Sequence, residues 1–199
     1  MADKDRYPTL DEFWKRLDLR EVEPDLIEEL RKRTSREQGE IGRAGPEELI
    51  VAVAARIVPG DVPAKALAVE LDKGFDKQAG RADDKAGLMP RSELVPTGFR
   101  IIDEESQKRF GKKFAEASSE QQDQILTDME KGNIKGPDKF DATTWFKRVR
   151  DSYMTAFGSD PRGMVQMGFP GPSYKPGHVW LGKGAVKARA KRKRGYMEL

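Results

Sequence analysis

Apolar residues recur at helical spacing from the first residues of the chain onward. Thr9 and Glu12 have the spacing of a capping box, and apolar residues follow at i, i+3, i+4 and i+7, which predicts a helix. Pro24 suits the first position of a second helix, because its missing N–H is not needed there. The apolar positions of these two helices are Leu10, Phe13, Trp14, Leu17, Leu26, Ile27 and Leu30.

Two more helices are expected after a glycine-containing break between Ser35 and Pro46. Pro46 opens the third helix, and the Pro59-Gly60 pair ends it, because proline cannot continue the hydrogen-bond ladder. The fourth helix is expected from about Pro63 to Gln78. Their apolar stripes are Leu49, Ile50, Val53, Ala54 and Ile57 in the third helix, and Leu67, Leu71 and Phe75 in the fourth.

The second half of the chain continues with three helical regions. The first covers roughly residues 92–116, with a start weakened by Pro96 and Gly98. Ser119 and Gln122 are expected to cap a shorter helix. The last helix runs from about 142 to 157, and its face is expected to be core; that face consists of Trp145, Phe146, Val149, Tyr153 and Phe157. No strand pair is visible, so the pattern predicts an all-α fold.

The pattern changes after Phe157. Residues 158–184 contain seven glycines and four prolines, a density that predicts no regular element. The same stretch is rich in large apolar residues, which is not typical of a disordered linker. We therefore expect one helical domain over residues 1–182, with an irregular C-terminal arm from about residue 158. Two arrangements of the arm stay open: it docks on a partner, or it folds back on its own helices.

Residue usage limits the chemistry available to the chain. There is no cysteine, and His178 is the one histidine, so disulfides, thiolate metal sites, iron–sulfur ligation and bis-histidine haem ligation are excluded. Dinucleotide, P-loop and nucleophile-elbow motifs are absent. Acidic pairs such as Glu47-Glu48 and Asp83-Asp84 are expected to be solvated. No catalytic, cofactor-binding or metal residue is assigned, although an enzyme with an unfamiliar carboxylate site stays an alternative.

The positive charge of the chain is concentrated at its C-terminus. The formal net charge is +3, and six of the eight residues from Lys187 to Arg194 are basic. A tail over residues 183–199 of this kind is either solvated or binds an anionic surface. A helical protein that binds nucleic acid through this tail is therefore the alternative function, but the body shows no basic stripe of comparable density.

Hydropathy indicates neither a membrane span nor a secretory signal. No run approaches the 18 or so apolar residues of a transmembrane helix, and residues 1–20 are charged throughout. No direct insertion into a membrane is expected. The compartment stays open between the cytoplasm and, if the chain is exported with a partner, the periplasm.

Several short motifs occur in a fixed order along the chain. They are Ile57-Val58-Pro59-Gly60-Asp61, Pro63-Ala64, Gly98-Phe99 before Ile101-Ile102-Asp103, Glu120-Gln121-Gln122, Ser159-Asp160-Pro161 directly after the aromatic helix, and Gly168-Phe169-Pro170-Gly171. Each motif alone has little specificity, but the ordered set resembles the gluconate 2-dehydrogenase subunit 3 family. The resemblance covers roughly residues 46–177.

The resemblance implies an accessory role rather than catalysis by this chain. Members of the family are small subunits of heteromeric dehydrogenases that oxidise a sugar, a sugar acid or a polyol. The large subunit is a flavoprotein of the glucose–methanol–choline (GMC) oxidoreductase type that binds FAD, and a cytochrome c subunit often accepts the electrons. The resemblance thus implies a small subunit without a cofactor of its own, which stabilises the flavoprotein or assists its maturation.

The chain also departs from the family pattern. No twin-arginine export signal stands at its start, and Arg162-Gly163-Met164 replaces the Gly-Gly-Asn stretch that usually follows the Asp-Pro motif. We nevertheless expect the start of the arm to contact the flavoprotein. The residues expected to bind the partner are Ser159, Asp160, Pro161, Arg162, Met164, Met167, Phe169, Pro170 and Tyr174.

Overall fold

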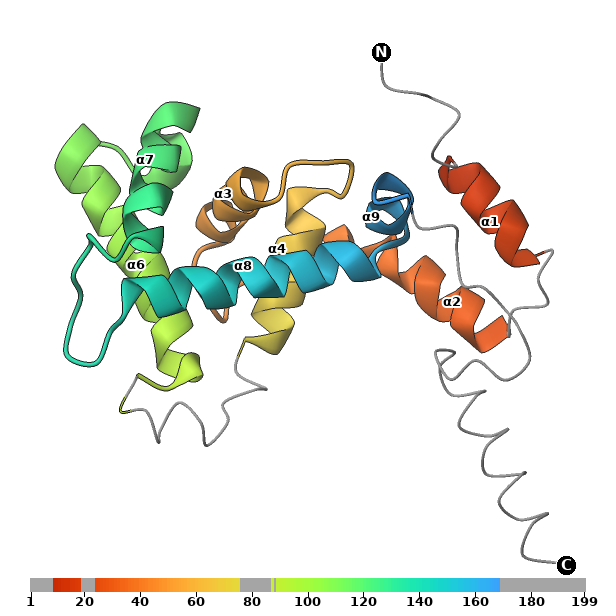
Figure 1. The fold of residues 1–199 in the computed structure, drawn as a ribbon, viewed down its shortest axis with the longest axis horizontal. Helices are drawn as coiled ribbons and strands as arrows, with labels where there is room; N and C mark the ends of the chain where they lie inside the picture. Colours follow the sequence, from red (N-terminus) through yellow and green to blue (C-terminus); the bar gives the residue numbers. More distant parts are fainter. Residues whose placement is uncertain (1–8, 19–23, 76–86, 88, 169–199) are drawn as a thin grey trace, which may run out of the picture. The chain divides into compact units, whose positions relative to one another are not determined.

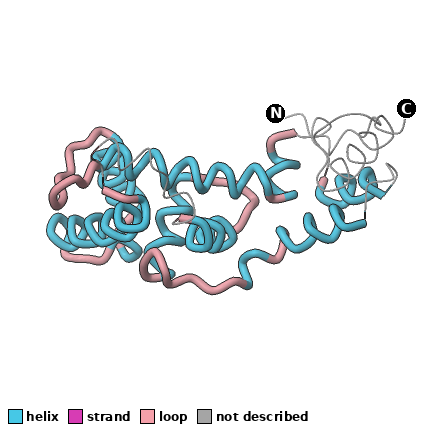
Figure 2. The backbone as a smooth tube through the Cα atoms, turned by 90° about the horizontal axis from the view of Figure 1, so that it is seen from below, coloured by secondary structure: helices cyan, strands magenta, loops and turns pink. Residues whose placement is uncertain are grey.

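The computed structural model describes residues 9–18, 24–75, 87 and 89–168. Every regular element in these ranges is a helix, which confirms the all-α prediction (Figures 1 and 2). Contacts refine the expected single domain into two compact units. Unit 1 combines Met1–Thr34 with Asp160–Leu199, and unit 2 is Ser35–Ser159.

The described residues of unit 2 form five α-helices and two short 3-10 turns. The long helix α8 packs along α4, α6 and α7, and α3 packs against α4 (Figure 1). The element bounds are η1 Arg36–Gln38, α3 Glu47–Ile57, α4 Ala64–Gly74, α6 Arg91–Phe110, η2 Phe114–Glu116, α7 Ser119–Glu130 and α8 Ala142–Ser159.

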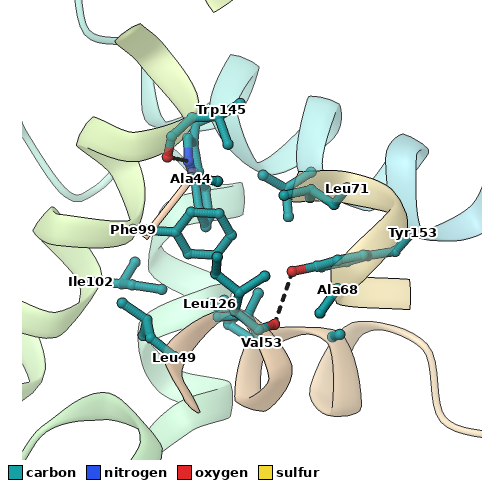
Figure 3. Close-up of a cluster of buried hydrophobic side chains, with 14 of the residues drawn as sticks. Ala44, Leu49, Val53, Ala68, Leu71, Phe99, Ile102, Leu126, Trp145 and Tyr153 are labelled. Atoms are coloured by element: carbon teal, nitrogen blue, oxygen red, sulfur yellow. Dashed lines mark hydrogen bonds between the residues drawn. The ribbon is translucent and has the colours of Figure 1, made fainter. Parts of the chain in front are cut away.

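The aromatic face of α8 supplies the centre of the unit 2 core, as predicted. Trp145 is fully buried, and its ring meets that of Phe99 edge-on at 5.3 Å (Figure 3). The indole Nε1 donates to the carbonyl of Val95 at 3.0 Å, so the buried polar atom of the ring is satisfied. Gly98 lies one turn beyond Val95 on α6, and a Cβ there would come within 2.1 Å of the indole. The close approach of α8 to α6 therefore requires a glycine.

A buried carboxylate holds the glycine-containing break before α3. Asp72 on α4 is 2% exposed, and its carboxylate accepts hydrogen bonds from three successive backbone N–H groups. The donor–acceptor distances are 3.3 Å from Gly42, 2.9 Å from Arg43 and 2.6 Å from Ala44. Charge-assisted bonds of this kind are stronger than neutral ones, so Asp72 fixes the path of this loop.

Unit 1 brings helices from both ends of the chain together. Its described helices are α1 Leu10–Asp18, α2 Pro24–Arg33 and α9 Pro161–Gln166. Its core is separate from that of unit 2 and contains Phe13 at 0% and Leu30 at 3% exposure. The partly buried residues around them are Leu10, Trp14, Leu26, Ile27, Met164 and Val165.

The start of α1 agrees with the sequence prediction, whereas the cap of α7 is displaced by one residue. Thr9 N donates to Glu12 Oε2 at 3.0 Å and Glu12 N to Thr9 Oγ1 at 3.2 Å, which confirms the capping box. For α7 the prediction of Ser119 with Gln122 was wrong. Ser118 and Gln121 form the capping box instead, because Gln122 is buried and its Nε2 donates to the carbonyl of Phe114.

Two predictions of helix extent were also wrong. The region expected as residues 92–116 ends at Phe110, where Gly111 adopts a left-handed conformation with φ 69°. Pro96 does not interrupt α6, because the carbonyl that lacks its N–H partner belongs to the exposed Ser92 in the first turn, where water reaches it. The second error concerns the arm: residues 161–166 form α9 despite the glycines and prolines around them.

Tyr153 gives the core a pH dependence at the alkaline end. Its hydroxyl donates to the carbonyl of Ile50 at 3.0 Å, and complete burial raises the pKa of Tyr153 well above 10 (Figure 3). In the unfolded chain the same phenol ionises near pH 10, so alkali stabilises the unfolded state. The stability that the neutral phenol contributes is therefore complete below about pH 10 and declines as the pH rises further.

We expect Tyr153→Phe to show this effect directly. At pH 8 the variant should be about 1 kcal/mol less stable, because one hydrogen bond is lost. Above pH 10 the difference should shrink, because only the wild-type chain loses stability through ionisation of this phenol. Urea unfolding at pH 8 and at pH 11 measures both differences. A gap that stays constant across this range would contradict the assignment.

Candidate functional site

The segment predicted to bind a partner begins where α8 ends. Arg36 reaches this end from η1: its Nη1 donates to the carbonyl of Ala156 at 3.3 Å and to Ser159 Oγ at 3.0 Å. Its Nε lies 3.5 Å from Glu70 Oε2. A cation beside the last carbonyls of a helix is favourable, so Arg36 fixes the position of Ser159 within unit 2.

Asp160 begins the unit 1 part of the segment and is completely buried. As the N-cap of α9 it accepts a hydrogen bond from Arg162 N at 2.9 Å, and Pro161 occupies the first helical turn. The guanidinium of Arg162 also binds the carboxylate through both oxygens, each at 2.9 Å. Both carboxylate oxygens of Asp160 are thus engaged within this turn, so its role in the structure is to cap α9.

The short helix α9 divides its apolar residues between core and solvent. Met164 and Val165 pack against the Phe13–Leu30 cluster. Met167, just beyond the helix, is 53% exposed, and Gly168 ends the turn with φ 71°. Among the described residues, Met154 on α8 and Met167 are the two exposed large hydrophobic side chains.

Six of the nine predicted binding residues lie among the described residues. Ser159 closes unit 2, and the five others belong to unit 1, namely Asp160, Pro161, Arg162, Met164 and Met167. Met164 packs against the helices of its own unit. This contact agrees with the second arrangement left open for the arm, in which it folds back on its own helices. Phe169, Pro170, Tyr174 and His178 lie outside the described residues. The binding role of the segment stays a prediction.

Sequence reasoning missed α9 although its signals were present. An Asp-Pro pair is a favoured N-cap followed by a favoured first helical residue, and Gly168 suits the position after a helix. The high density of glycine and proline in residues 158–184 nevertheless led to the prediction of an irregular segment. For Arg36 no sequence signal exists, because its partner Ser159 lies 123 residues away.

The face of α7 carries a charged depression whose carboxylates are engaged in hydrogen bonds and ion pairs. It is lined by Arg109, Glu120, Asp123, Gln124, Thr127 and Asp128. Hydrogen bonds from Asn133 and Arg109 lower the pKa of Asp128, and those from its own backbone and Ser118 lower the pKa of Glu120. Asp123 accepts from Arg56 Nε at 2.8 Å. Asp128 and Glu120 are held ionised, so neither is suited to donate a proton near neutral pH.

None of the described helices is both long and apolar enough to cross a membrane.

Comparison with known proteins gives one family. The family model with the description "Gluconate 2-dehydrogenase subunit 3" matches residues 45–177, two thirds of the chain. The matched range covers all of unit 2 from Gly45 onward and also α9. No curated protein and no solved structure gives a significant match.

Proposed function

The chain belongs to the gluconate 2-dehydrogenase subunit 3 family, and we propose that it is a non-catalytic accessory subunit of a heteromeric FAD-dependent dehydrogenase. The family match is the observation that carries this proposal. The large subunit of the proposed complex is a GMC-type flavoprotein that oxidises a sugar, a sugar acid or a polyol. FAD belongs to that partner, and a cytochrome c subunit can take up the electrons.

The work proposed for the chain is mechanical. A subunit that binds only the folded flavoprotein stabilises that state by mass action, to an extent set by its concentration relative to the dissociation constant. Stable association of this kind commonly buries about 2,000 Å² or more in total. The same contact would assist maturation of the flavoprotein, because binding of the folded form shifts the folding equilibrium away from partly folded states.

Met167 is the best-supported contact residue in the described part of the binding segment. It follows α9 directly, and 53% of its surface remains exposed within the chain. Exposed methionine is common at binding surfaces, because its flexible thioether adapts to the partner's shape. Asp160 and its ion pair with Arg162 hold the start of α9 in place. Met167 is therefore presented from an ordered turn rather than from a loose end.

We expect Met167→Ala to weaken binding of the flavoprotein by about 1–3 kcal/mol while the melting temperature of the free subunit stays nearly unchanged. The variant for comparison is Met164→Ala, three residues earlier, within α9. Met164 packs within unit 1, so its truncation should loosen the free subunit itself. Titration of the flavoprotein with each variant, beside thermal melts of the free subunits, measures both effects. Equal binding by wild type and Met167→Ala would remove Met167 from the interface.

The proposed function is tested with the tagged chain expressed in its source organism. A flavoprotein should co-purify with it and show flavin absorbance and sugar-dependent reduction of a dye. Deletion of the gene should lower the amount of active flavoprotein. The purified chain alone should show neither a flavin spectrum nor dye reduction. Dehydrogenase activity in the isolated chain, or capture of no flavoprotein, would overturn the proposal.

A further inference from the structure

The helix that carries part of the predicted binding segment is covered by helices outside the family match. The match covers residues 45–177, so it includes α9 but neither α1 nor α2. In the structure α9 packs against both of these helices. Phe13 and Leu30, the two core residues of unit 1, both come from outside the matched range.

The contact covers part of the apolar side of α9. Met164 and Val165 are partly buried against the Phe13–Leu30 cluster, whereas Met167 is exposed. The segment therefore has one apolar side chain exposed and two partly covered. All of these contacts lie within unit 1.

The cover is built to be released easily. α1 and α2 are nine and ten residues long, α9 has six, and helices of this length have little stability without packing. Among the described residues they share a core of two buried apolar side chains, which is separate from the larger core of unit 2. Regions with few buried apolar contacts open at a lower free energy than the rest of a protein.

We propose that α1 and α2 are an intramolecular cover of α9 that competes with the flavoprotein for Met164 and Val165. This proposal rests on the proposed function. Met167 makes the first contact, and release of α1 and α2 then adds Met164 and Val165 to the interface. The apparent affinity is therefore the affinity of the open form multiplied by the fraction of molecules that are open. The cover also keeps an apolar surface out of water until the partner is present.

Two full-length variants shift the cover in opposite directions. Phe13→Ala removes its central side chain and should open it. A lock is made by joining Leu10→Cys to Val165→Cys with a short bis-maleimide, which is selective because the chain has no cysteine of its own. The same double variant capped with N-ethylmaleimide is the control for the lock. Val53→Ala, in the separate core of unit 2, is the control for Phe13→Ala.

Hydrogen exchange of the α9 amides in the free chain is the first measurement. It should become about tenfold faster in Phe13→Ala and slower in the locked chain, with no change in Val53→Ala. Amides of α9 that exchange at the same rate in Phe13→Ala as in the wild type would overturn the cover without bearing on the proposed function.

Affinity for the flavoprotein that co-purifies with the wild-type chain is the second measurement. Phe13→Ala should bind it several-fold more tightly, and the locked chain about tenfold more weakly than its capped control. If Phe13→Ala unfolds unit 1 altogether, the locked chain still tests the proposal. If α1 and α2 stay packed on α9 in the complex, the locked chain should bind the flavoprotein as well as its capped control does. Wild-type binding with no gain in Phe13→Ala and no loss on locking would overturn the cover alone. A wild-type chain that captures no flavoprotein would overturn the cover and the proposed function together.

Discussion

Gly98→Ala is expected to destabilise unit 2 by about 3 kcal/mol, although the same exchange inside a helix usually stabilises. A Cβ at this position would lie 2.1 Å from Nε1, 2.2 Å from Cδ1 and 2.5 Å from Cε2 of Trp145. The indole is completely buried and hydrogen-bonded to the carbonyl of Val95, so it has little room to move. The overlap must be relieved by moving α8 away from α6, which disrupts the packing of Phe99 as well.

Gly74→Ala is the matched control for this prediction. Gly74 is also helical, at the end of α4, and no atom of the described residues outside the local helix backbone lies within 4 Å of a Cβ built there. Alanine at this position should be neutral or stabilise by up to about 1 kcal/mol, because it restricts the unfolded chain. Calorimetric melts of the wild type and both variants give the comparison. A Gly98→Ala variant as stable as Gly74→Ala would contradict the close approach of α6 and α8.

Asp72→Ala is expected to cost about 3 kcal/mol, since three backbone N–H groups lose a buried, charged acceptor. The residue is 2% exposed, and its bonds to Gly42, Arg43 and Ala44 connect α4 to the loop before α3. Without them the loop should detach. Arg43 is exposed, so trypsin should cleave after it much faster in the variant than in the wild type.

Two further substitutions define the contribution of the carboxylate. Asp72→Asn keeps one acceptor oxygen in a side chain of similar shape. Its stability should therefore lie between that of the wild type and that of Asp72→Ala. Glu104→Ala removes a carboxylate whose ion pair with Arg100 is solvent-exposed, and it should change stability by less than about 1 kcal/mol. Calorimetry and tryptic digestion of the same samples provide both readouts. Equal stability of Asp72→Ala and Glu104→Ala would show that the loop does not depend on Asp72.

The candidate binding segment was predictable only in part. Its place after the aromatic helix follows from the sequence, because α8 has a clear apolar periodicity that ends near residue 157. The helix α9 was predictable in principle from Asp160, Pro161 and Gly168, each of which has a local conformational preference at a helix end. That Met164 is covered while Met167 is exposed depends on α1 and α2, whose contact with α9 leaves no mark in the sequence.

Local interactions explain what the sequence determined by itself. Helical periodicity, the Thr9–Glu12 capping box and the proline at the start of α2 act within one or two turns, so the all-α class and the positions of most helices can be derived without a structure. The buried aromatic face of α8 was predictable for the same reason, since its residues recur at a spacing that places them on one side of a helix.

Contacts between distant residues explain what only the tertiary structure decided. Arg36 binds the end of α8 across 123 positions, and Asp72 holds a loop about 30 positions earlier in the chain. Gly98 is required only because Trp145 occupies the space beside it. Charged and small residues of this kind occur throughout the sequence, and burial beside a particular partner is what makes these few indispensable. The pairing of the two chain ends in unit 1 was decided in the same way, by an apolar cluster to which neither end contributes enough surface alone.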